Sequence, residues 1–122
     1  MPAVIDEGVL SQLFALVEAS ERPKFQQQVF SVFLESSAEN MKHLKDAVSH
    51  VDSESVKKSA HALKSSALNL GGTGFAQMCA ILEDAAKKRE TTSYAAQLSK
   101  IEKEHALLIH ELKSRLHLSS AS

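Results

Sequence analysis

Apolar residues recur every three or four positions along five segments of this chain, and no segment sustains the alternating pattern of a β-strand. The clearest stripe runs along Val56, Ala60, Leu63, Ala67 and Leu70, whose spacing marks one face of a helix. Glycine, proline and aromatic residues are scarce, whereas Ala, Leu, Lys, Glu, Gln and Ser are plentiful, which favours helices over sheets. The pattern therefore predicts an all-α fold.

The five predicted helices are joined by short connections that carry turn and capping residues. Glycine at Gly71-Gly72 can close the third helix in the left-handed conformation, and Thr73 can then cap the fourth. We expect the four long helices to pack as an antiparallel up-down four-helix bundle, with the short first helix covering one end. The predicted segments run from about Glu7 to Ala19, from Pro23 to Ser49, from a cap at Asp52 or Ser53 to Gly71-Gly72, from Thr73 to a break at Thr91–Ser93, and from Tyr94 to Leu112.

The length of 122 residues fits one domain, so we expect a single domain over 1–122, with its core at about 7–116 and a frayed tail at 117–122. Cys79 is the only cysteine, which excludes an intrachain disulfide and favours a reducing, cytoplasmic location. We identify no signal peptide and no apolar run long enough to cross a membrane. A net charge of -1 argues against nucleic-acid binding.

The sequence lacks the motifs of several kinds of chemical site. No glycine-rich loop is followed by Lys-Ser or Lys-Thr, so we expect no nucleotide site. The 6 histidines form no His-Glu-x-x-His pair, and we expect neither a metal nor a cofactor on this chain. His105 is predicted to lie in the core or at a helix seam. Solvated surface positions are expected for His43, His50, His110 and His117.

His61 stands out because of its position on the third predicted helix. At about 100° per residue it lies roughly 140° from the centre of the apolar stripe, so it should face solvent. Residues three or four positions away include Lys57, Lys58 and Lys64, which places the imidazole among cations. A neutral imidazole is a nucleophile, and nearby ammonium groups can stabilise an anion attached to it. Taken alone, such a histidine is more often an inert surface residue.

The residues that follow His61 form a distinctive string. Positions 61–72 read His-Ala-Leu-Lys-Ser-Ser-Ala-Leu-Asn-Leu-Gly-Gly, and Phe75, Cys79 and Leu82-Glu83 come after them. This pattern resembles the signature of histidine phosphotransfer (HPt) domains. The resemblance is specific over 60–83 and extends more loosely, through helix pattern and length, over about the whole chain. The matching residues are His61, Leu63, Lys64, Ser66, Ala67, Asn69, Leu70, Gly71, Cys79, Leu82 and Glu83.

The resemblance implies that the chain is a phosphorelay intermediate. His61 would accept a phosphoryl group from the aspartate of one response-regulator receiver domain and pass it to the aspartate of another, while Lys64 would pair with the phosphoryl oxygens. The implied partners are receiver domains and a hybrid sensor histidine kinase. Mg²⁺ would be bound by the receiver and not by this chain. The chain itself would be a monomeric carrier without kinase activity.

Three residues are predicted to contact a docked receiver. Ser65 stands where the family most often has Gly, four residues after the histidine, so the site should be slightly narrower. Leu68 is larger than the small residue common at its position, and on the His61 side of the helix it would expose apolar area to a partner. Lys57 is expected to belong to the same docking surface.

Glu83 is level with His61 if the helical hairpin turns at Gly72, because both residues lie equally far from that turn. Two interpretations are open. The carboxylate could accept a hydrogen bond from the imidazole and fix its tautomer, leaving the other nitrogen free. It could equally be a surface carboxylate paired with Lys87 at helical spacing.

A rival hypothesis treats the chain as a passive helical adaptor. In that case the helical surface binds a partner, and His61 takes no part. Exchange of His61 for Gln separates the two hypotheses, because only a relay protein would lose phosphotransfer.

Overall fold

The computed structural model describes residues 4–115, and every regular element within that range is helical. Asp6 caps the first helix, its side chain accepting hydrogen bonds from the N–H groups of Gly8 and Val9, and Asp52 caps α3 through the N–H of Ser55. The elements are α1 (Glu7–Phe14), a 3-10 turn (Ala19–Glu21), α2 (Arg22–Ser49), α3 (Ser53–Asn69), α4 (Thr73–Lys87), a second 3-10 turn (Thr91–Ser93) and α5 (Tyr94–Arg115).

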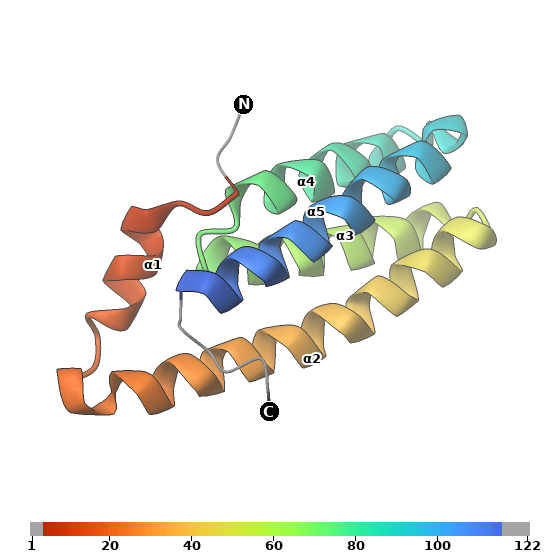
Figure 1. Ribbon diagram of the computed structural model, residues 1–122. Helices are drawn as coiled ribbons and strands as arrows, with labels where there is room; N and C mark the ends of the chain where they lie inside the picture. Colours follow the sequence, from red (N-terminus) through yellow and green to blue (C-terminus); the bar gives the residue numbers. More distant parts are fainter. Residues whose placement is uncertain (1–3, 116–122) are drawn as a thin grey trace.

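Helices α2 to α5 form an antiparallel up-down bundle, and α1 lies at one end of it (Figure 1). Successive helices reverse direction, so that α3 packs between α2 and α4, and α5 packs against α4 and α2. The predicted all-α architecture with an additional short N-terminal helix is confirmed. The predicted tail at 117–122 lies outside the described residues. None of the described helices is both long enough and apolar enough to span a membrane.

The first helix is shorter than predicted, because α1 ends at Phe14 and not at Ala19. The apolar pattern continues beyond Phe14, yet Leu16 is 78% exposed. The side chain of Arg22, at the start of α2, donates hydrogen bonds to the carbonyl oxygens of Phe14 and Val17. This tertiary contact satisfies the Phe14 carbonyl, which the end of the helix leaves free, and the Val17 carbonyl in the turn that follows.

Helices α2, α3 and α4 all end in the same type of turn. One residue in each turn takes a left-handed backbone conformation, at Val51 (φ 51°), Gly71 (φ 74°) and Arg89 (φ 55°). The next N–H donates to a carbonyl five residues back, as in the 2.8 Å hydrogen bond from Gly72. The predicted left-handed glycine is confirmed at Gly71. The N-cap of α4 is Gly72, however, and the prediction of Thr73 as the cap is wrong.

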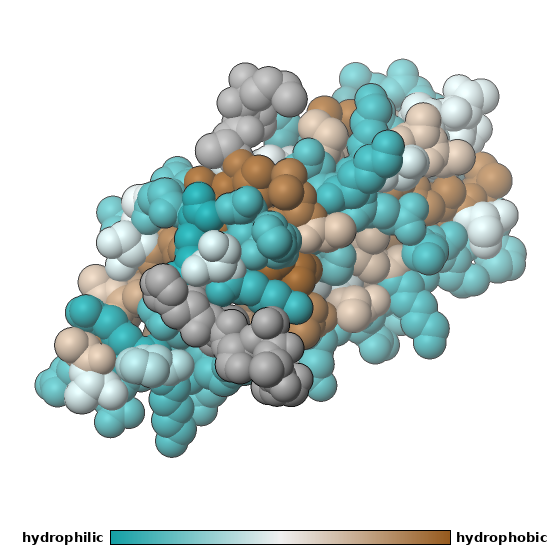
Figure 2. Space-filling model, in the orientation of Figure 1, coloured by the Kyte–Doolittle hydropathy of each residue, from teal (hydrophilic) through white to brown (hydrophobic). Residues whose placement is uncertain are grey.

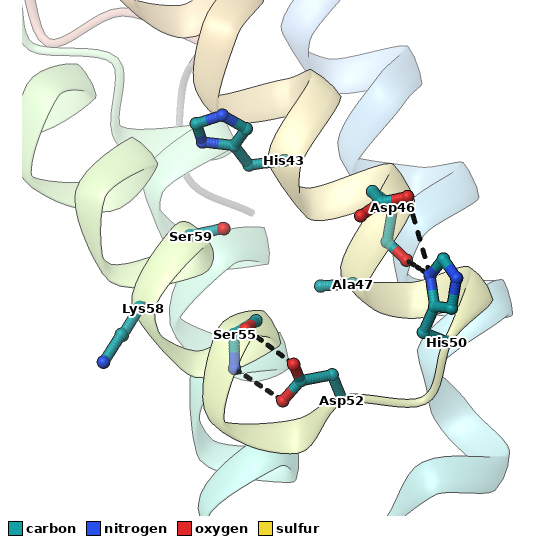
Figure 3. Close-up of a pocket in the computed structure, with 8 residues that line it drawn as sticks. All are labelled: His43, Asp46, Ala47, His50, Asp52, Ser55, Lys58 and Ser59. Atoms are coloured by element: carbon teal, nitrogen blue, oxygen red, sulfur yellow. Dashed lines mark hydrogen bonds and ion pairs between the residues drawn. The ribbon is translucent and has the colours of Figure 1, made fainter.

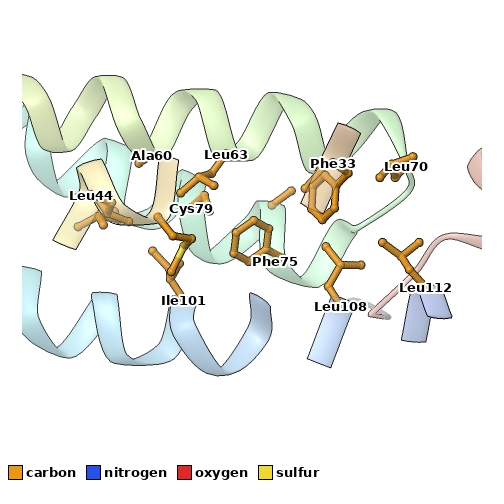
Figure 4. Close-up of a cluster of buried hydrophobic side chains, with 14 of the residues drawn as sticks. Phe33, Leu44, Ala60, Leu63, Leu70, Phe75, Cys79, Ile101, Leu108 and Leu112 are labelled. Atoms are coloured by element: carbon orange, nitrogen blue, oxygen red, sulfur yellow. The ribbon is translucent and has the colours of Figure 1, made fainter. Parts of the chain in front are cut away.

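The apolar stripes of the four long helices meet in one buried cluster (Figure 4). Its fully buried members include Leu63 on α3, Phe75 and Cys79 on α4, and Ile101 on α5. Burial raises the pKa of the Cys79 thiol to about 12, so this thiol stays protonated at neutral pH. Hydrophilic residues predominate on the face drawn in Figure 2, where apolar residues form smaller patches. This shared core holds α3 and α4 side by side and so positions the side chains between them.

Candidate functional site

His61 lies in the middle of α3, on the side of the helix next to α4. Its side chain is 61% exposed, which confirms the predicted exposure to solvent. The opposite side of α3 is anchored in the core, where Ala60 and Leu63 are fully buried. The imidazole is therefore presented to the outside from a helix that is fixed by packing.

The ring of His61 contacts a buried carboxylate across the α3–α4 hairpin. Its Nδ1 lies 3.0 Å from Oε2 of Glu83, and Glu83 is only 7% exposed. An ionised carboxylate can only accept hydrogen bonds, so Nδ1 must carry the proton of the neutral ring. Nε2, the other ring nitrogen, forms no hydrogen bond with any described residue and keeps its lone pair. The contact sets up a nucleophilic nitrogen on the exposed side of the site.

The Glu83 carboxylate forms ion pairs with two lysines in addition to its contact with His61. Nζ of Lys64 lies 2.6 Å from Oε1, and Nζ of Lys87 lies 3.8 Å from Oε2. Desolvation raises the pKa of the Glu83 carboxyl, but hydrogen bonds from Lys64 and His61 outweigh it, so the net pKa lies below its ordinary value. The carboxylate is thus ionised at neutral pH. Its burial makes the interpretation as a surface carboxylate wrong, although the contact with Lys87 is present.

Sequence reasoning missed the ion pair between Lys64 and Glu83. The hairpin register places Glu83 level with His61, and Lys64 follows His61 by one turn. The direction in which the long lysine side chain turns is set by the approach of α3 to α4, which the register does not reveal. The pair places the Lys64 ammonium in the same cluster as the imidazole.

The predicted docking residues lie on α3 in two different environments. Ser65 is exposed, and Leu68 keeps 47% of its surface exposed. Lys57 is half-buried and forms a 3.2 Å ion pair with Glu54. A separate apolar groove of about 300 Å³ lies between α2 and α3, and none of these three residues lines it. Its apolar lining consists of Phe25, Val29, Val32, Phe33 and Leu70.

The remaining described histidines divide as predicted. His105 on α5 is half-buried, with Nε2 2.8 Å from Oγ of the buried Ser37 and its ring centre 5.4 Å from that of Phe75. Burial lowers the pKa of this imidazole. The seam position predicted for His105 is confirmed, as are the exposed positions of His43, His50 and His110. His117 is not among the described residues.

A polar pocket of about 350 Å³ lies between the end of α2 and the start of α3 (Figure 3). Its polar groups are largely paired with one another, since His50 contacts Asp46 and Ser55 contacts Asp52. The lining includes none of the residues that surround the Glu83 carboxylate. Within residues 4–115, no three His, Cys, Asp or Glu side chains are grouped so that they could hold a metal ion.

Comparison with known proteins points to the same helices. The family model of the Hpt domain matches residues 28–117, which include most of α2, all of α3 to α5, and both His61 and Glu83. Among solved structures, the chain is similar to histidine-containing phosphotransfer protein B (HptB) from Pseudomonas aeruginosa PAO1. The two share 25% sequence identity with a TM-score of 0.84, and the match covers 96% of this chain and 97% of that chain. No curated protein matches the chain.

Proposed function

The chain belongs to the Hpt domain family, and we propose on that basis that it is a phosphorelay intermediate which carries the phosphoryl group on His61. Hpt proteins are phosphotransfer carriers that interact with two-component kinases and response regulators. In this proposal His61 accepts the group from the aspartate of one receiver domain and passes it to the aspartate of another. A hybrid sensor histidine kinase in the cytoplasm supplies the first receiver, and this chain has no kinase activity of its own.

The observation that carries the proposal is the exposed His61 ring held at Nδ1 by a buried carboxylate. Nε2 attacks phosphorus with its lone pair, so that an N–P bond forms while the bond from phosphorus to the aspartyl oxygen breaks. The electron pair of the broken bond returns to the aspartate, which leaves as a carboxylate. No proton has to leave Nε2. The ring becomes positively charged, and the Glu83 carboxylate at 3.0 Å balances that charge.

Lys64 stabilises the transferred group in this proposal. It follows His61 by one helical turn, so its ammonium can turn from Glu83 to the phosphoryl oxygens. The receiver contributes Mg²⁺, which neutralises charge in the loose transition state of the transfer. Because the partner holds the metal, this chain needs neither a metal nor a cofactor.

The exposed side of α3 is the proposed docking surface for the receiver. Ser65 adds little bulk next to His61, Leu68 offers apolar area, and Lys57 contributes positive charge. His61 serves one receiver at a time in this proposal, and the carrier acts as a monomer.

Transfer from a labelled receiver tests the proposal. We expect label to move from a phosphorylated receiver to the chain, to be released by acid, and to be absent from His61→Gln although that variant folds and binds the receiver. His43→Gln, which alters an exposed histidine on α2, is the control and should accept label normally. If the wild type binds receivers but never takes label, the passive adaptor explains the chain instead.

A further inference from the structure

The buried carboxylate of Glu83 needs a counter-ion, and Lys64 supplies it. Nζ of Lys64 donates a 2.6 Å hydrogen bond to Oε1, while the Glu83 side chain is 9% exposed. Removing one partner of a buried ion pair leaves an uncompensated charge, which is strongly unfavourable. The ammonium of Lys64 thus has two roles. It pairs with Glu83 in the unphosphorylated protein, and under the proposed function it pairs with the phosphoryl group.

A second lysine stands beside the same carboxylate. Lys87 follows Glu83 by one turn on α4, and its Nζ lies 3.8 Å from Oε2. This distance allows an ion pair but exceeds the length of about 2.9 Å typical of a hydrogen bond. The Lys87 side chain is 59% exposed, so its ammonium can move toward the carboxylate without repacking the core.

We infer that Lys87 is a positioning residue. Its ammonium becomes the counter-ion of the Glu83 carboxylate when the ammonium of Lys64 turns to the phosphoryl group. The inference rests on the proposed function. The phosphorylated ring of His61 is positive, but the phosphoryl group attached to it carries negative charge close to Glu83. By exchanging one lysine for the other, the cluster keeps an ammonium group on its buried carboxylate in both states, beside the ring at Oε2. The N–P bond forms at Nε2 of His61 as described above, and the exchange itself neither gains nor loses a proton. Lys87 thereby favours the phosphorylated state without touching the phosphoryl group.

Lys88 provides a matched control for this inference. It carries the same charge at the same end of α4, but its Nζ lies 3.0 Å from the exposed carboxylate of Asp84. Its side chain is as exposed as that of Lys87. Lys88→Gln therefore removes the same charge from the same end of the helix while leaving the contacts of Glu83 in place.

The test is the equilibrium distribution of label between the chain and one receiver. Lys87→Gln should lower the ratio of phosphorylated to free His61 by about threefold, as expected for an ion pair that is only partly exposed. Lys87→Arg keeps a cation and should stay close to the wild type, and Lys88→Gln should change the ratio much less than Lys87→Gln. Equal effects of Lys87→Gln and Lys88→Gln would overturn the inference, since the general loss of charge would then explain both.

A Lys64→Gln background separates counter-ion exchange from direct contact with the phosphoryl group. Without Lys64 no lysine has to leave Glu83, so adding Lys87→Gln should have no further effect. An undiminished effect would show that Lys87 acts on the phosphoryl group itself. Circular dichroism checks the fold of each variant, and the comparison of Lys87→Gln with Lys88→Gln does not depend on the Lys64 variant. A wild type that takes no label would refute the proposed function, whereas a labelled wild type with no Lys87 effect would refute only the exchange.

Discussion

The His61 imidazole has two nitrogens, and one contact decides which of them would attack phosphorus in the proposed transfer. The carboxylate of Glu83 accepts from Nδ1 across a distance of 3.0 Å and so selects the ring form whose Nε2 carries the lone pair. A free neutral imidazole favours the opposite form, in which Nε2 holds the proton and is not nucleophilic. The rate of phosphoryl acceptance should therefore depend on a residue that never touches the phosphoryl group.

Glu83→Ala should slow phosphoryl acceptance by roughly tenfold, the lower end of the effect of losing a group that orients a reactive histidine. The neutral His61 ring should shift at the same time toward the form with its proton on Nε2. Nitrogen-15 NMR of the ring reports the tautomer, and transfer from a labelled receiver reports the rate. Asp84→Ala removes the neighbouring exposed carboxylate on α4 and should change neither quantity. Slow transfer with an unchanged tautomer would contradict this role of Glu83.

The sequence was sufficient to place Glu83 level with His61 but not to decide which residues the Glu83 carboxylate contacts. Helical hairpin geometry follows from the position of Gly72, so two residues equally far from the turn are level with each other. The burial of Glu83 and its contact with Lys64 depend on how closely two helices approach, and on which rotamer a long side chain adopts. Neither property can be read from spacing alone.

The ends of the helices show a similar division between what the sequence signals and what tertiary structure decides. At Gly71 the missing side chain makes a left-handed residue easy to predict. Val51, after α2, and Arg89, after α4, take the same conformation without any such signal in their residue type. A β-branched residue in this region is strained, so Val51 should lower the stability of the α2–α3 connection.

Val51→Gly should raise the free energy of unfolding by about 1 kcal/mol, because glycine removes the left-handed strain at a smaller entropic cost. The Val51 side chain is exposed, so little buried surface is lost. Urea denaturation followed by circular dichroism measures the change. Gly71→Ala should have the opposite sign, since its Cβ would lie 2.6 Å from the backbone oxygen of Asp6. A Val51→Gly protein that is no more stable than the wild type would show that this turn is unstrained.

For the bundle as a whole, two titratable groups, the half-buried His105 and the buried Glu83, link stability to pH in different ranges. His105 joins α5 to Ser37 of α2 and Phe75 of α4, and desolvation holds its pKa below the ordinary value of 6.5. Glu83 joins α4 to α3, and its hydrogen bonds hold its pKa below 4.5 despite desolvation. For both groups the unfolded chain binds a proton more readily than the folded one, so acid destabilises the bundle. As the pH falls, the unfolded chain takes up a proton at His105 before it does so at Glu83, because the ordinary pKa of histidine is 6.5 and that of glutamate is 4.5.

The free energy of unfolding should therefore decline as the pH drops below about 6.5, with a slope of up to about 1.4 kcal/mol per pH unit while only the unfolded chain is protonated at His105. Above that pH the imidazole is neutral in both states and contributes no slope. Urea denaturation between about pH 5 and pH 7 measures the effect before the contribution of Glu83 begins. His105→Gln should flatten the curve in this range, whereas His43→Gln, which replaces an exposed histidine, should keep it. An unchanged slope in His105→Gln would mean that the sensitivity to acid lies elsewhere in the bundle.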